Sequence, residues 1–189
     1  DLAAETAASR ELDFLCSAMA TGLYSPLLLP LREKLALIDS IQQGWDYCAG
    51  GSVVYLGLET GQEQLPELLD QLAILLPELA AGLAEDYFSL TQACFATSQA
   101  ALLDDPQKLA YRLGELALAG EPLQDERGEL LGYEGISMEQ INRLCGQLFS
   151  GKATAITAVT ADGGRLDEVE RGMDTLRAGL PRGKSPKGQ

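Results

Sequence analysis

Two short stretches with the residue pattern of β-strands follow one another closely, and long helical patterns lie on both sides of them. The stretches are 38–45, IDSIQQGW, and 51–59, GSVVYLGLE, and the glycines between them suit a connecting turn. A third run, ATAITAVT at 153–160, is rich in β-branched residues. Because two or three strands make a very small sheet, the sequence predicts the α+β class, with a small antiparallel sheet covered by helices on one face.

The sheet predicted in this way is small enough that we expect a further strand, supplied by residues upstream of Asp1 or by a partner. We expect residues 1–163 to form one α+β domain. Residues 164–189 are expected to add a C-terminal helix and then a basic tail, predicted to be disordered.

Apolar residues recur at helical spacing through most of the remaining sequence. The stretches concerned are 4–23, 25–37, 65–83, 84–103, 106–119 and 137–149. Ser25 and Asp105 are expected to cap their helices, and SMEQ at 137–140 is a capping box. LPEL occurs at 65–68 and again at 76–79, which predicts a core stripe rather than an interaction motif. Pro77 is expected to bend or end its helix.

The charge of the chain limits its partners. The sequence carries 14 basic and 28 acidic residues, a net charge of −14, which repels phosphate backbones and argues against nucleic-acid binding. It favours solubility first and basic partners second. Because no apolar run approaches the roughly 20 residues that span a bilayer, we expect a soluble protein without membrane insertion. Its compartment stays open between the cytoplasm, the periplasm and an organelle.

The sequence contains no histidine. This excludes Ser-His-Asp and Cys-His catalysis, and any histidine-ligated metal, within the chain. The four cysteines lie far apart, with no C-x-x-C pair, and are interpreted as structural and reduced, although a disulfide stays open: Cys16, Cys48, Cys94 and Cys145. We therefore expect no catalytic residue, no metal ligand and no bound cofactor in this chain.

A series of residues around the predicted strands matches a known family pattern. The run ELDFLCSAMATGLYSPLLLPLREKLALIDSI and the later GGSVVYLGLETGQEQLPELLDQL carry it, in the positions Gly22, Ser25, Leu31, Arg32, Glu33, Lys34, Leu37, Gly50, Gly51, Tyr55 and Gly57. Downstream, GISMEQINRLCGQLF and ATAITAVTADG match a closing helix and strand. Over residues 8–163 the chain resembles the M16 metallopeptidases, which include pitrilysin, insulysin, the mitochondrial processing peptidases and the core subunits of the cytochrome bc1 complex.

The resemblance implies a non-catalytic domain. In that family one α+β domain carries the zinc motif H-x-x-E-H and a homologous domain completes a peptide-binding chamber. This chain, lacking histidine, resembles the second kind, so the zinc and the catalytic residues are expected in a partner domain or subunit. The implied partners are that zinc-bearing domain and a peptide substrate, in a dimer or larger assembly. The family's first strand, which precedes the opening helix, has no counterpart here.

The resemblance also assigns one candidate site residue. Arg32 occupies the position of an arginine that holds substrate near the zinc, while Asp39 stands where the family has a tyrosine seven residues later. A carboxylate cannot donate as a phenol does, but it could pair with Arg32. Trp45 and Tyr47 either line the chamber or pack the turn.

Other classes of function remain open at this point. The chain could be a purely structural subunit, like the core proteins of a respiratory complex, with no role in peptide binding. It could also be an independent helical adaptor that uses an acidic face. An unrelated two-carboxylate enzyme is possible with 28 acidic residues to choose from, but no pair of acids stands out in the sequence.

Overall fold

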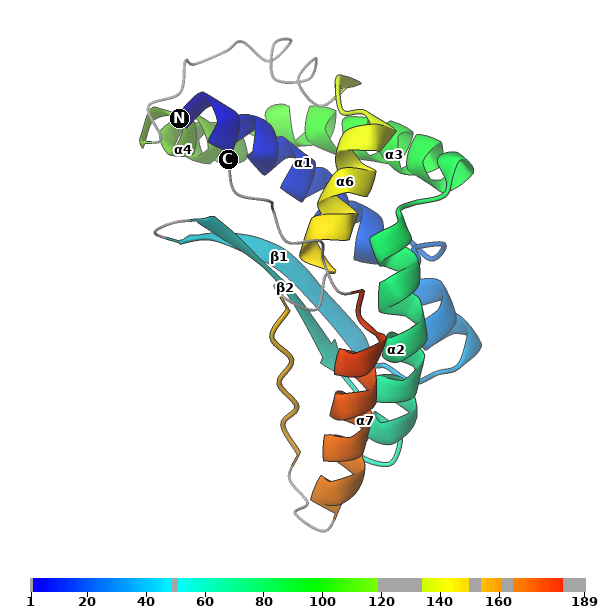
Figure 1. Cartoon of the computed structure of the whole chain (residues 1–189). Helices are drawn as coiled ribbons and strands as arrows, with labels where there is room; N and C mark the ends of the chain where they lie inside the picture. The colour runs from blue at the N-terminus through cyan, green and yellow to red at the C-terminus, as the bar shows by residue number, and fades with distance from the viewer. Residues whose placement is uncertain (1, 49–50, 119–133, 150–153, 161–164, 182–189) are drawn as a thin grey trace.

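The computed structural model describes residues 2–48, 51–118, 134–149, 154–160 and 165–181 (Figure 1). In chain order its elements are α1 (Leu2–Ala20), the π-helix η1 (Leu29–Lys34), β1 (Ser40–Cys48), β2 (Gly51–Glu59), α2 (Leu65–Ala81), α3 (Glu85–Leu103), α4 (Pro106–Leu118), α6 (Met138–Leu148) and α7 (Leu166–Gly179). Within the described residues this is a helical layer with one two-stranded antiparallel sheet. The prediction of an α+β fold is confirmed.

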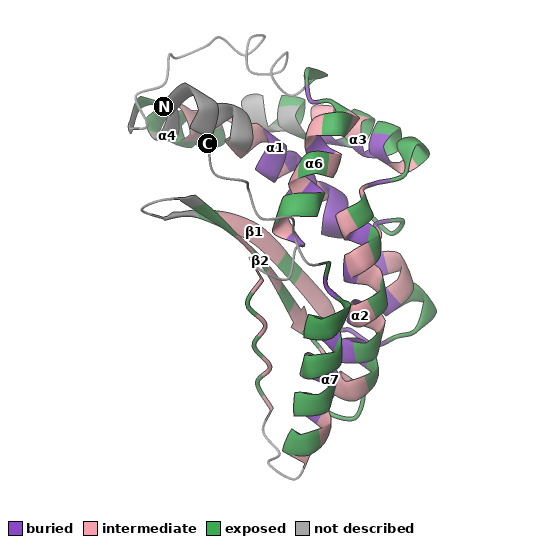
Figure 2. Ribbon diagram, in the orientation of Figure 1, coloured by how far each residue is buried: buried purple, intermediate pink, exposed green. Residues whose placement is uncertain are grey.

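The two strands pair along their full length, from Ser40 opposite Glu59 to Cys48 opposite Gly51. Alternate side chains point to opposite faces of such a sheet. Trp45 and its cross-strand partner Val54 pack against the hydrophobic core, whereas Val53 and Tyr55 are 54% and 46% exposed. The predicted arrangement, with helices on one face of the sheet, is therefore present, and the other face is open (Figure 2).

Helix α1 lies at the centre of the core. Phe14, Leu15 and Met19 are fully buried. The Phe14 ring lies 5.2 Å from Phe88 and 5.4 Å from Phe95, both on α3, in tilted and edge-on arrangements. These are the offset geometries that aromatic rings prefer. The cluster joins α1 to α3 without any polar group.

The stretch 25–37 departs from the short α-helix predicted for it. The Leu28 N–H donates to Ser25 Oγ at 3.0 Å, so the expected cap is present. The helix that follows is a π-helix, in which the Leu35 N–H reaches back five residues to the Pro30 carbonyl at 3.2 Å. Ala36 then adopts a left-handed backbone (φ 50°), and the Leu37 N–H bonds the Leu31 carbonyl at 2.7 Å. This closes the helix end in the manner of a Schellman cap.

Helix α2 carries the predicted core stripe. Leu76 is buried and Leu65 packs against the same core, so both copies of LPEL contribute to it. Of the two outcomes expected at Pro77, the end of the helix is wrong, because α2 continues to Ala81, and a bend stays a prediction. Proline has no N–H for the carbonyl of Ala73, four residues earlier. Helix α7 approaches that carbonyl closely, since a β-carbon on Gly179 would lie 3.1 Å from the Ala73 oxygen. Tertiary packing thus outweighs the local preference.

Helix α6 connects to helix α1 and to the junction between α2 and α3 through side-chain hydrogen bonds. The capping box is present: the Gln140 N–H donates to Ser137 Oγ and the Ser137 N–H to Gln140 Oε1. The Gln140 amide also donates to the buried Glu11 of α1 at 2.9 Å. Asn142 Oδ1 accepts a hydrogen bond from the Leu83 N–H at 2.9 Å.

The predicted cap at Asp105, at the start of α4, is likewise confirmed. Its carboxylate accepts hydrogen bonds of 3.0 and 3.3 Å from the N–H groups of residues 107 and 108.

The third predicted strand is extended but is not part of the sheet. Residues 154–160 alternate between half-buried and exposed, and Ile156 and Ala158 pack against the core. No ladder joins this segment to β2 among the described residues. The alternation of apolar and polar residues predicts which side chains face the core. It does not predict whether the backbone is aligned with a neighbouring strand so that the two can form hydrogen bonds. The division at residues 163 and 164 and the missing first strand stay predictions, and the tail 182–189 lies outside the described residues.

Candidate functional site

Arg32 lies on η1, next to Leu31, which is fully buried. The Arg32 side chain is 53% exposed, and its Nε lies 3.9 Å from Glu33 Oε1. An exposed pair at this distance contributes little stability. The guanidinium therefore retains donors for an external ligand, such as a peptide carbonyl or carboxylate.

Asp39 is exposed at the point where the chain enters the sheet. Its N–H donates to the Glu59 carbonyl at 2.8 Å, directly after the buried pair Leu37 and Ile38. The suggested ion pair with Arg32 is not present among the described residues, where Arg32 contacts Glu33 instead. The left-handed turn at Ala36 and the two buried residues separate the two side chains along the chain. Asp39 thus belongs to the sheet edge, and Arg32 to the preceding helix.

The open face of the sheet begins next to Asp39. Ser40 Oγ donates to Glu59 Oε2 at 2.7 Å across the strands. Further along, the Tyr55 ring lies over Gly44, its cross-strand partner, so closely that a β-carbon there would be 2.7 Å from the ring carbon Cζ. Glycine at position 44 thus provides the space for the aromatic ring. The result is a surface of mixed polar and aromatic character with acidic ends.

Sequence reasoning did not single out this open face. Its signal is the period-two alternation in GSVVYLGLE, which places Val53 and Tyr55 opposite to Val54 and Leu56. Trp45, considered as a chamber residue, lies on the covered face instead. Its indole N–H donates to Asp13 Oδ1 at 2.8 Å. The Tyr47 side chain lies outside the described residues.

The two buried cysteines are not candidate nucleophiles. Cys16 and Cys145 are free and buried, and burial raises the pKa of each thiol to about 11. Cys94 is free and exposed on α3, and the Cys48 side chain lies outside the described part. Within that part, no group of three or more metal-binding side chains converges on one point.

Comparison with solved structures finds proteins of similar fold. A crystal structure from Bordetella pertussis Tohama I, described as that of a "putative zinc protease", aligns over 75% of this chain and 79% of its own, with 16% identity and a TM-score of 0.56. The likeness is one of fold. No family profile matches the sequence, and no curated protein matches it either. None of the helices in the described residues is long and apolar enough to cross a membrane.

Proposed function

We propose that this chain is a non-catalytic domain or subunit of an M16-type zinc metallopeptidase, in which it completes the peptide-binding chamber and supports assembly. One observation carries the proposal: a chain without histidine has the fold of a structure described as a zinc protease. A fold alone does not define a function. Here, however, the chain shares the fold of that structure but has no histidine, so it lacks the histidine ligands of an H-x-x-E-H zinc site.

The structure supplies a surface suited to such a role. Helices cover one face of the β1–β2 sheet, and the other face is open, with Tyr55 as its aromatic centre (Figure 2). Arg32 lies on the helix that leads into this sheet and keeps an exposed guanidinium. In the proposed assembly, Arg32 binds a peptide carbonyl or carboxylate, and the open face of the sheet forms part of the chamber wall. Zinc, bound by the partner, would supply water activation, and this chain would hold and orient the peptide.

The competing proposal is a purely structural subunit without a role in peptide binding. Asp39 favours it, because this position carries a carboxylate where the family has a tyrosine donor. An ionised Asp39 near a developing oxyanion would oppose the reaction. The two proposals agree on the fold and the partner and differ on whether Arg32 touches the substrate.

The deciding experiment uses the assembly that co-purifies with the full chain. We expect a protein carrying H-x-x-E-H in that assembly, and we expect Arg32→Ala to lower its kcat/KM for peptides about ten- to a hundredfold, as for a lost charged hydrogen bond. Lys34→Ala is the matched control, since Lys34 is an exposed cation on the same helix. Unchanged turnover with intact assembly would favour the structural subunit. Peptide hydrolysis by the purified chain alone would refute both proposals.

A further inference from the structure

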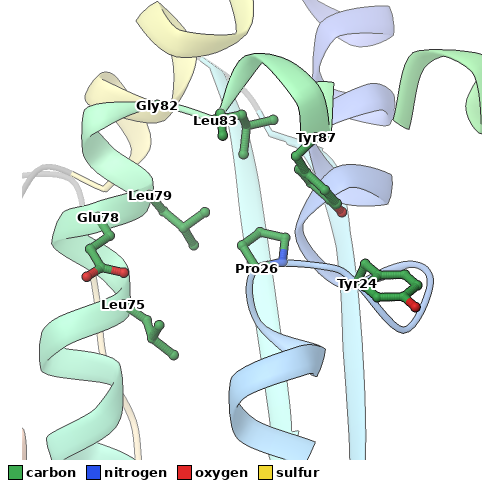
Figure 3. A pocket seen from close by; sticks show the side chains of 9 residues that line it. Tyr24, Pro26, Leu75, Glu78, Leu79, Gly82, Leu83 and Tyr87 are labelled. Carbon is green, nitrogen blue, oxygen red and sulfur yellow. The ribbon is translucent and has the colours of Figure 1, made fainter. Parts of the chain in front are cut away.

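A hollow of about 270 Å³ lies in the helical layer, away from the sheet (Figure 3). The end of α2 forms one side, and the turn at residues 22–26 with the start of α3 forms the other. Leu75 and Leu79 point from α2 toward Pro26, and Tyr24 and Tyr87 lie on the far side. The volume falls just below the roughly 300–1,000 Å³ of small-molecule sites. It is suited to a side chain rather than a cofactor.

The floor of this hollow is held in place by the fold. Leu79 and Leu83 are buried. Between them, Gly82 has a positive φ of 111°, and Asn142 of α6 accepts a hydrogen bond from the Leu83 N–H. A side chain at position 82 would also collide with Asn142. The apolar surface is thus preformed, which reduces the entropic cost of binding.

Two tyrosines border the hollow in different ways. The Tyr87 hydroxyl donates to the Ala18 carbonyl of α1, which fixes its ring. Tyr24 is 71% exposed and belongs to an uncharged turn. Its ring extends the apolar surface on the side of the hollow opposite α2.

Helices α2 and α3, which contribute most of the lining of the hollow, carry only acidic charges. Glu78 is exposed at the rim, and Glu85 and Asp86 follow directly after the lining residue Ala84. No lysine or arginine occurs between residues 35 and 107, so α2 and α3 contain no cation. The charged residues of that stretch are all acidic: Asp39, Asp46, Glu59, Glu63, Glu67, Asp70, Glu78, Glu85, Asp86, Asp104 and Asp105.

We propose that this hollow binds a lysine side chain, or the similar arginine, presented by a basic partner protein. The alkyl stem packs on Pro26 and Leu79, and the cation reaches the Glu78 carboxylate at the rim. All of these residues belong to the helical layer. The site is therefore separate from the open sheet face, and it stands or falls independently of the proposed chamber role.

The test is a titration of the full chain, followed by backbone amide NMR, with the peptide acetyl-Ala-Leu-Lys-Leu-Ala-amide. A second peptide with norleucine in place of lysine keeps the stem and removes the charge. We expect saturable shifts at the amides of Leu79, Gly82 and Leu83, and tighter binding of the lysine peptide. Glu78→Gln should weaken the lysine peptide about two- to fivefold, the range of an exposed ion pair, and leave the norleucine peptide unchanged.

Two further variants complete the design. Tyr24→Ala should weaken both peptides to the same extent, because the ring contributes contact area and lies on the side of the hollow opposite Glu78. Glu67→Gln changes an exposed glutamate on the same helix outside the hollow and should weaken neither. The absence of saturable shifts at these amides would overturn the proposal. So would equal affinity for the two peptides, or an unchanged lysine preference in Glu78→Gln.

Discussion

The indole N–H of Trp45 on β1 donates a 2.8 Å hydrogen bond to Asp13 Oδ1 on α1. This bond joins the covered face of the sheet to the central helix across 32 residues of sequence. It also explains why tryptophan occupies a position on a sheet whose other face is open. The bond fixes the angle at which the hairpin lies on the helical layer.

Trp45→Phe should destabilise the fold by about 1.5–3 kcal/mol, because the half-buried Asp13 carboxylate, a charged acceptor, loses the hydrogen bond that the indole N–H donates to it. The measurement is urea unfolding followed by far-UV circular dichroism. Tyr55→Phe is the control: it removes a hydroxyl from the open face of the same sheet, and we expect a change within about 0.5 kcal/mol. Equal effects of the two substitutions would show that the Trp45–Asp13 bond contributes nothing particular.

Gly172 of α7 lies against Leu69 of α2. A β-carbon on Gly172 would lie 2.8 Å from Leu69 Cδ1 and 3.0 Å from its Cβ. Gly172→Ala should therefore destabilise the fold by about 1–3 kcal/mol through overpacking, although alanine is the better helix former.

Gly114→Ala in α4 measures the effect of helix propensity on stability in the absence of overpacking. Nothing lies within 4 Å of the added carbon there, so we expect stabilisation by about 0.5–1 kcal/mol. Thermal unfolding of both variants measures the difference in sign. A stabilised Gly172→Ala protein would mean that α7 does not pack on α2 as described.

The sequence predicted correctly those features that depend on interactions between residues close together in the chain. The capping box at Ser137 and Gln140 and the cap at Asp105 are present because their hydrogen bonds span three residues or fewer. The hairpin strands were predicted within a few residues of their true ends, as turn glycines and alternation suggested. These features require no knowledge of what packs against them.

The features that escaped prediction depend on contacts between distant segments. Helix α2 continues through Pro77 where α7 covers it, and Trp45 faces inward, where Asp13 of α1 accepts a hydrogen bond from its indole N–H. The buried Glu11 finds its partner 129 residues away. Likewise, the hollow combines a turn near residue 24 with the junction of α2 and α3. None of these pairs has a periodic or spacing signal in one sequence.

Thiol labelling should separate the cysteines by burial. With pKa values near 11, the thiols of Cys16 and Cys145 are ionised in about one molecule in a thousand at pH 8, and thiolate is the reactive form. In a Cys48→Ser background, we expect iodoacetamide to modify Cys94 in the native protein. Cys16 and Cys145 should react only after unfolding. Mass spectrometry of tryptic peptides reads out each site, and native labelling of Cys145 would contradict its burial.

The same two thiols should make the fold sensitive to alkaline pH. Burial raises each pKa from 9.0 to about 11, with the Asp13 carboxylate adding to the shift at Cys16. The folded state therefore holds these protons more tightly than the unfolded state. Their contribution to stability is complete below pH 9 and is lost as the pH rises through 11. By pH 10.5 the loss should be on the order of 1–2 kcal/mol per thiol.

Comparing the wild-type chain with Cys16→Ala/Cys145→Ala tests this linkage. The variant is expected to be less stable at pH 8, because it loses buried volume, but its stability should fall less between pH 8 and pH 10.5. Urea midpoints at the two pH values give both quantities, and the tyrosines common to both proteins cancel in the difference. Parallel losses in the two proteins would mean that the buried thiols do not control the alkaline transition.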